Sequence, residues 1–296
     1  MSATIAPAPL AEILPPVIRR GRVRTFLRRH PTAALGGALI AAMVCIAVFA
    51  PWLGTVDPTA IDPIHRLADP SARHWFGSDM LGRDIYSRTL YGARISLLVG
   101  FSVAFFASAA GTLVGVTAGF VRLADSILMR IMDGLMSIPP ILLAIALMAL
   151  TRASVRNVIF AISVAQFPAI SRLVRGIVLS LREQPFVEAA IASGTRLPRL
   201  IWRHILPNTM AALLVQATFT CASAMITEAI LSFIGAGTPP IIPSWGNIMA
   251  EGRALWEIKP YIVFFPAAFL SVTVLAVNLL GDGLRDALDP RLAKRL

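Results

Sequence analysis

Residues with the potential for chemistry are few and widely separated in this 296-residue chain. It has no Gly-x-x-x-x-Gly-Lys-Ser/Thr phosphate loop, so it does not bind ATP as P-loop proteins do. The four histidines lack metal-ligand spacing, and both cysteines, Cys45 and Cys221, lie in apolar runs where they pack as small hydrophobes. No nucleophile, base and acid combine into a catalytic set. These features predict a protein that is not an enzyme and has no metal or cofactor of its own.

Glu228 is the one acid well inside an otherwise apolar stretch, TEAILSFIGAG. A charge at the middle of a membrane costs about 2.5–3.5 kcal/mol, so this side chain should face a partner or water. One interpretation makes it a cavity or gate residue, and the other pairs it with an arginine near the outer interface. Pro139 and Pro140 interrupt another apolar run, as happens both beside translocation paths and at simple packing kinks.

The composition indicates a membrane protein. The chain is 56% hydrophobic and only 15% charged, with a mean hydropathy of +0.73, whereas soluble domains contain about 25% charged residues. Apolar stretches near the required length of about 20 residues recur along the chain. They predict an all-α protein with six transmembrane helices, at residues 32–56, 95–121, 131–151, 157–180, 207–234 and 260–281. A transmembrane barrel is excluded, because its strands would alternate in polarity.

The net charge of +11 is a topology signal and not a sign of nucleic-acid binding. With the N-terminus in the cytoplasm, six spans place 18 of the 27 basic residues inside, in agreement with the positive-inside rule. Both termini are then cytoplasmic, as a basic tail at residues 1–31 and a short tail at 284–296. Residues 57–93 form an extracytoplasmic segment with an interfacial amphipathic helix, and Arg122 to Asp133 form a charged inner turn.

The segment from Phe186 to Asn208 lies between two spans but carries five charged or titratable side chains, so it stands outside the hydrocarbon. Gly194 and Pro198 divide it into two short helical pieces, and Pro207 is expected to end the second. The first piece is rich in alanine, which allows another backbone to approach closely. We expect this amphipathic elbow to dock a soluble partner.

Several motifs carry a resemblance to a known family. Glu188-Ala189-Ala190, Gly194 and Leu206-Pro207 resemble the EAA loop that fits a groove on the ATPase subunit of ABC importers. The RHILPN form from Arg203 resembles the peptide and nickel importers of this class. FGSDMLGRD at 76–84, SFIGAGTPPIIPSWGNIM at 232–249 and VNLLGDGLRDALDPR at 277–291 also look like family signatures. Over about residues 70–292, the chain resembles the C-type permease of dipeptide and oligopeptide ABC importers.

The resemblance implies a type I ABC importer permease fold in the bacterial cytoplasmic (inner) membrane, with its core at residues 94–283 and the EAA coupling loop at 182–207. It also implies a second homologous permease, two ATP-binding cassette subunits that hold ATP and Mg, and an extracytoplasmic substrate-binding protein. The alternatives are a nickel or other small-solute permease of the same family and a stand-alone secondary transporter. The residues expected to couple to the ATPase are Glu188, Ala189, Ala190, Gly194, Arg203, Leu206 and Pro207. The residues expected on the path or gate are Glu228, Pro139 and Pro140.

Overall fold

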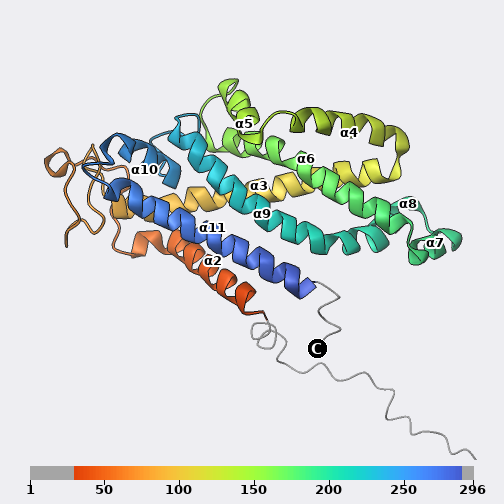
Figure 1. Ribbon diagram of the computed structural model, residues 1–296. Helices are drawn as coiled ribbons and strands as arrows, with labels where there is room; N and C mark the ends of the chain where they lie inside the picture. Colours follow the sequence, from red (N-terminus) through yellow and green to blue (C-terminus); the bar gives the residue numbers. More distant parts are fainter. Residues whose placement is uncertain (1–29, 289–296) are drawn as a thin grey trace, which may run out of the picture.

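The longest helix, α3 (Ile85–Phe120), has 36 residues, and no proline interrupts it. The Asp84 carboxylate caps its start by accepting a hydrogen bond from the backbone N–H of Ser87 at 2.8 Å. In this computed structural model, which describes residues 30–288, α3 runs through the middle of an elongated helical bundle (Figure 1). The described part of the chain contains no β-strand, which confirms the all-helical prediction.

Five helices in the described range are long and apolar enough to cross a membrane, and a bent pair makes a sixth candidate span. The five are α2 (Pro31–Phe49, extended by the 3-10 turn η2, Ala50–Trp52), α3, α6 (Val155–Arg182), α9 (Leu206–Phe233) and α11 (Tyr261–Leu288). The bent pair is α4 (Arg122–Met136) and α5 (Pro140–Ala149). The shorter elements are η3 (Pro63–His65), α7 (Pro185–Ala192), α8 (Leu197–Leu200), η4 (Ile201–Ile205), α10 (Trp245–Gly252) and η5 (Arg253–Leu255).

Small residues bring the long helices together. Along α3, Gly111, Gly115 and Gly119 recur every four residues and face α6. A Cβ atom at Gly115 would lie 2.7 Å from the Ser171 carbonyl oxygen, so a larger residue would force the helices apart. Gly36 of α2 is as close to the backbone of α11. Close approach at small residues is the usual way in which helices associate inside a membrane.

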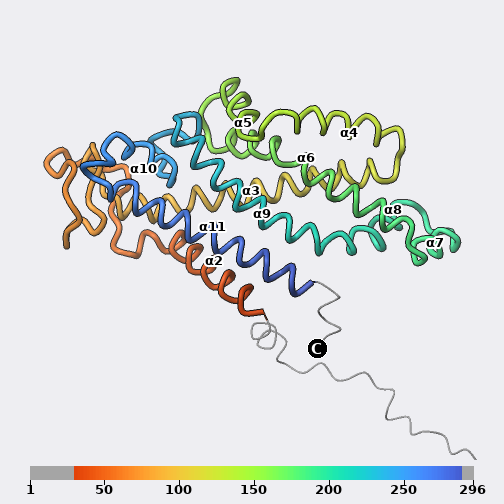
Figure 2. Tube along the Cα trace, in the orientation of Figure 1, coloured from red at the N-terminus to blue at the C-terminus, as the bar shows by residue number. Residues whose placement is uncertain are grey.

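The bundle has two different ends (Figures 1 and 2). At one end, which we call the cap end, residues 53–84 and α10 fold over the tips of the long helices. At the other, the coupling end, α7 and α8 project beyond the bundle. The chain enters α2 and leaves α11 on the side away from the cap end. Most of the expected tails lies outside the described residues, but residues 284–288, expected in the C-terminal tail, are instead the end of α11.

Three local predictions need correction. The separate interfacial helix expected before the second span is instead the first part of α3, because no proline or other break separates Tyr86 from the apolar run. The expected charged turn at Arg122 to Asp133 is instead most of α4, whose carboxylates bond to arginines of α6. The span expected at 131–151 is broken: α4 ends at Met136, and α5 begins at Pro140 after a bend of 88°. The Pro139–Pro140 pair accounts for this break, since Pro139 is extended (φ −51°, ψ 132°).

Candidate functional site

The segment between α6 and α9 ends its first helix in a way that requires glycine. After α7, the backbone N–H of Thr195 donates to the Ala190 carbonyl at 3.1 Å, and Gly194 N–H donates to the Ile191 carbonyl at 2.9 Å. Gly194 has a φ of +77°, the left-handed conformation of this helix-ending motif. At the other end of α7, Pro185 occupies the first turn, and Glu188 in the same turn complements the helix dipole. The sequence thus fixes a short rigid helix.

Three apolar side chains anchor this segment to the bundle, and most of the others point away. Val187, Leu200 and Ile205 are at most 2% exposed and pack with Val174 and Val178 of α6. The sequence identifies Leu200 and Ile205 as apolar positions of the amphipathic second piece, but sequence reasoning missed Val187, whose apolar side chain next to Glu188 could have identified it. The expected coupling residues Glu188, Ala189, Gly194, Arg203 and Pro207 are exposed, while Ala190 and Leu206 are half-buried.

Exposed apolar and basic side chains share the projecting surface. Phe186, Ile191 and Trp202 are 42%, 56% and 74% exposed. Arg196 and Arg199 lie beside them and are also exposed. These side chains are not buried against the bundle. Exposed large apolar residues with charged residues around them are typical of a protein–protein contact.

Pro207 does not end the second piece, contrary to the sequence prediction. The chain continues from α8 through the π-helical turn η4 into α9, and Pro207 lies in the first turn of α9. In η4 the backbone N–H of Leu206 donates to the Ile201 carbonyl, five residues back. A proline inside a regular α-helix would clash with the carbonyl four residues earlier. The wider turn accommodates the ring, so α8 joins α9 without a break.

At the cap end, the glycines of the FGSDMLGRD motif occupy positions that no other residue could. Gly77 and Gly82 have φ values of +79° and +77°. A Cβ atom at Gly82 would lie 1.8 Å from the Asp62 carbonyl oxygen, and one at Gly77 would lie 2.7 Å from the Ala68 carbonyl oxygen. The motif therefore encodes a tightly folded loop.

The charged residues of the same motif form a buried ion-pair network. Asp79 accepts from Arg83 Nε at 2.7 Å and from Arg88 Nη1 at 2.5 Å. Both arginines also pair with Glu251 at the end of α10. Arg88 and Asp79 have only 1% of their side chains exposed. The network joins the loop, α3 and α10 across 163 residues of sequence.

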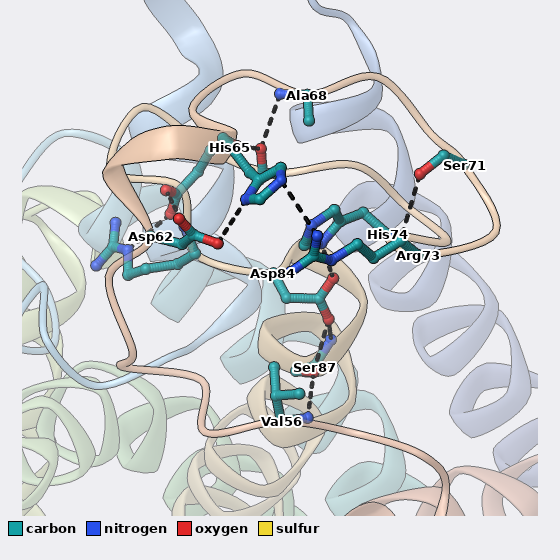
Figure 3. A network of polar contacts seen from close by, with 12 residues as sticks. Val56, Asp62, His65, Ala68, Ser71, Arg73, His74, Asp84 and Ser87 are labelled. Carbon is teal, nitrogen blue, oxygen red and sulfur yellow. Dashed lines mark hydrogen bonds and ion pairs between the residues drawn. The ribbon is translucent and has the colours of Figure 1, made fainter.

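A second, more exposed network lies beside the first (Figure 3). His65 Nδ1 donates to Asp62 at 2.7 Å, and this hydrogen bond lowers the pKa of the Asp62 carboxyl. His74 Nδ1 donates to Asp84 at 3.2 Å, and Arg73 Nη1 donates to His65 Nε2 at 3.3 Å. Among residues 30–288, no group of three or more His, Cys, Asp or Glu side chains could hold a metal ion. The network closes the loop over the start of α3.

Glu228 lies inside the protein, beneath the cap, and is 0% exposed. Its Oε1 atom accepts from Ser232 Oγ at 2.9 Å, while Oε2 has no hydrogen-bond partner among the described residues. Among the described residues, hydroxyl groups rather than an arginine surround it. Ser232 contacts Thr238 at 3.3 Å, and Thr238 contacts Ser244 at 3.4 Å. The cluster ties the end of α9 to the loop that leads into α10.

Two ion pairs link α4 to α6. Arg175 donates to Asp125 with Nε at 2.5 Å and Nη2 at 2.7 Å, and Arg172 Nη2 donates to Asp133. Pro139 and Pro140 lie just beyond, exposed at the bend.

A groove of about 520 Å³ between α6, α9 and α11 opens on the same half of the bundle, where Gln216 and Arg285 are its polar lining residues. Charges at this level of α6 require water, a counter-charge or a partner.

Two family models match the chain. One, described as a binding-protein-dependent transport system inner membrane component, matches residues 111–294. The other, described as the N-terminal TM domain of oligopeptide transport permease C, matches residues 21–70. Together they cover the first helix and everything from the second half of α3 onward, and residues 71–110 lie between the two matches.

Named relatives match over almost the whole chain. A probable peptide ABC transporter permease protein of Sinorhizobium fredii is 53% identical over 280 residues, 95% of this chain and 96% of that protein. The dipeptide transport system permease protein DppC of Alkalihalophilus pseudofirmus is 42% identical, covering 90% of this chain and 88% of its own. The glutathione transport system permease protein GsiD of Escherichia coli is 42% identical over 94% of both chains.

A solved structure shares the fold. A chain of the MetNI methionine ABC transporter in an inward facing conformation aligns with a TM-score of 0.55 at 20% identity. The alignment covers 69% of this chain and 98% of that one. The expected fold, that of an ABC importer permease, is therefore confirmed.

Proposed function

Because the chain belongs to the family of binding-protein-dependent transport system inner membrane components, we propose that it is a permease subunit of an ATP-driven importer of short peptides. It is a multi-pass protein of the inner membrane. The peptide substrate is supported by the relatives described as peptide, dipeptide and glutathione permeases. No relative cited above is described as a nickel permease.

The projecting segment carries the mechanistic part of the proposal. Its anchors Val187, Leu200 and Ile205 fix it to α6, and its apolar and basic surface is left uncovered. An ATPase subunit with a matching groove would bind this surface from the cytoplasm. Since α8, η4 and α9 are continuous, a displacement of α7 would be transmitted into a membrane-spanning helix. ATP-driven closure of the ATPase pair would then rock the permease between inward-facing and outward-facing states.

The proposed assembly has four further subunits besides this chain. A second homologous permease would supply the other half of the path, and two ATP-binding cassette subunits would hold ATP and Mg. A substrate-binding protein would deliver the peptide at the cap end. The exposed bend at Pro139 and Pro140 would border the path. Glu228, which is fully buried, would act by positioning the cap rather than by contacting solute.

Reconstitution tests this function. Proteoliposomes that contain both permeases and both ATPases, supplied with binding protein outside and ATP inside, should accumulate a labelled dipeptide. The same vesicles with this chain alone should accumulate none. Peptide uptake by the isolated chain would support a secondary carrier, and ATP-driven nickel uptake without peptide uptake would support the metal alternative. Either result would contradict the proposal.

A further inference from the structure

Arg172 lies at membrane depth however α6 is placed in the bilayer. Helix α6 has 28 residues and is therefore about 42 Å long. Arg172 follows its first residue, Val155, by 17 positions, or about 26 Å. A hydrocarbon core about 30 Å thick that α6 crosses completely then includes Arg172. Asp133 of α4 is at the same depth, because it accepts a hydrogen bond from Arg172.

The two side chains of this ion pair are partly exposed on the surface of the described chain. The Arg172 and Asp133 side chains are 46% and 60% exposed, more than the neighbouring Arg175–Asp125 pair at 34% and 25%. Gly176, one turn further along α6, and Gly134, next to Asp133, have no atom within 4 Å of where a Cβ would lie. Two half-exposed charges within the hydrocarbon thickness are disfavoured against lipid, and the open space beside Gly134 and Gly176 favours water as their surroundings.

We propose that the Arg172–Asp133 pair lines the aqueous path and contacts the charged termini of the transported peptide. The inference rests on the proposed function and specifies a residue pair for it. A short peptide carries an ammonium group at one end and a carboxylate at the other, so an exposed arginine and an exposed aspartate are complementary to both. Arginine suits the carboxylate because its planar fork donates two parallel hydrogen bonds. The more buried Arg175–Asp125 pair holds α4 against α6.

Thiol accessibility tests whether this surface is aqueous. Gly176→Cys adds a side chain into open space, in a Cys45→Ser background that removes the exposed native thiol. In the complete complex with its binding protein, a membrane-impermeant, charged methanethiosulfonate should label Gly176→Cys. It should not label Leu113→Cys, on an exposed apolar face of α3. Labelling of Gly176→Cys by a lipid-permeant maleimide alone would mean that lipid or the second permease covers the surface, and it would overturn the proposal.

Protection by substrate tests the peptide contact. During ATP turnover, trialanine should slow labelling of Gly176→Cys about tenfold, the effect of one charged hydrogen bond. Arg172→Gln should abolish this protection, Arg172→Lys should retain much of it, and Arg175→Gln should leave it intact. Binding-protein-stimulated ATPase activity verifies that each variant assembles. Unchanged protection in Arg172→Gln, or no protection in the wild type, would refute the contact. If the wild-type complex imports no peptide, the proposed function fails, whereas the labelling alone still decides whether the surface is aqueous.

Discussion

The turn between α7 and α8 depends on one residue, Gly194. Its φ of +77° lets α7 end and the chain turn into α8. An alanine in this conformation costs about 1–2 kcal/mol, so Gly194→Ala should tilt or loosen α7. We predict that the assembled variant hydrolyses ATP but imports less peptide per ATP hydrolysed than the wild type. Parallel assays of uptake and phosphate release measure this ratio.

The control for this variant is Gly37→Ala. Gly37 lies in α2 with a helical conformation, and the nearest atom to an added Cβ, from the Leu280 side chain, is 3.9 Å away. Its ratio of uptake to hydrolysis should equal that of the wild type. An unchanged ratio in Gly194→Ala would show that the turn is not needed for coupling.

We expect Glu228 to stabilise the folded protein through the carboxylate oxygen that accepts a hydrogen bond from Ser232. Glutamine in its place can still accept from Ser232, so Glu228→Gln should unfold at nearly the wild-type temperature. Glu228→Ala leaves the buried hydroxyls without this acceptor, at a cost of about 1–3 kcal/mol. Thermal unfolding of the purified protein, followed by intrinsic tryptophan fluorescence, compares the two. Equal destabilisation by both substitutions would mean that the carboxylate makes an interaction that an amide cannot replace.

At the level of elements, the cap is held by buried charged side chains, each of which is paired with a side chain of opposite charge. Arg88 is 1% exposed and pairs with both Asp79 and Glu251. Arg88→Met would leave Asp79 and Glu251 to share Arg83 as their one remaining cation in this network, and removing one partner of a buried ion pair costs about 3–5 kcal/mol. We predict that this variant is extracted largely as aggregate, as measured by size-exclusion chromatography of detergent-solubilised membranes.

Arg73→Met is the matched control for the cap. Arg73 bonds to His65 at the exposed edge of the second network (Figure 3), where such contacts contribute at most about 1 kcal/mol. The variant should therefore elute as the wild type does. If Arg88→Met also elutes as a single folded peak, the buried network is not what holds the cap.

The sequence predicted those elements whose cause is local. Apolar runs of about 20 residues are sufficient to indicate spans, and the EAA, FGSD and C-terminal motifs were sufficient to indicate the family. Pro139 and Pro140 signalled a break, but not its 88° bend, which depends on how α4 packs on α6. The pairing of Asp133 with Arg172 joins residues 39 positions apart, and no local pattern encodes it. The π-helical turn before Pro207 was missed because a proline usually ends a helix.

On the scale of the whole molecule, the two ends of the bundle differ in structure. The cap end is closed by networks of hydrogen bonds and ion pairs, whereas at the coupling end the short helices α7 and α8 project beyond the bundle (Figure 1). This asymmetry fits a permease that receives a solute on one side of the membrane and energy on the other. The orientation expected from the basic residues places the coupling end in the cytoplasm.

Site-specific photo-crosslinking tests this account most directly. A benzophenone amino acid would replace Ile191, 56% exposed on α7, or Ile241, 69% exposed at the cap end, where it lines the same pocket as Glu251 of α10. In the assembled transporter, we predict that position 191 crosslinks to an ATPase subunit and that position 241 never does. Crosslinks from Ile241 but not Ile191 to the ATPase, or an Ile191 probe that reaches no other subunit, would contradict the account.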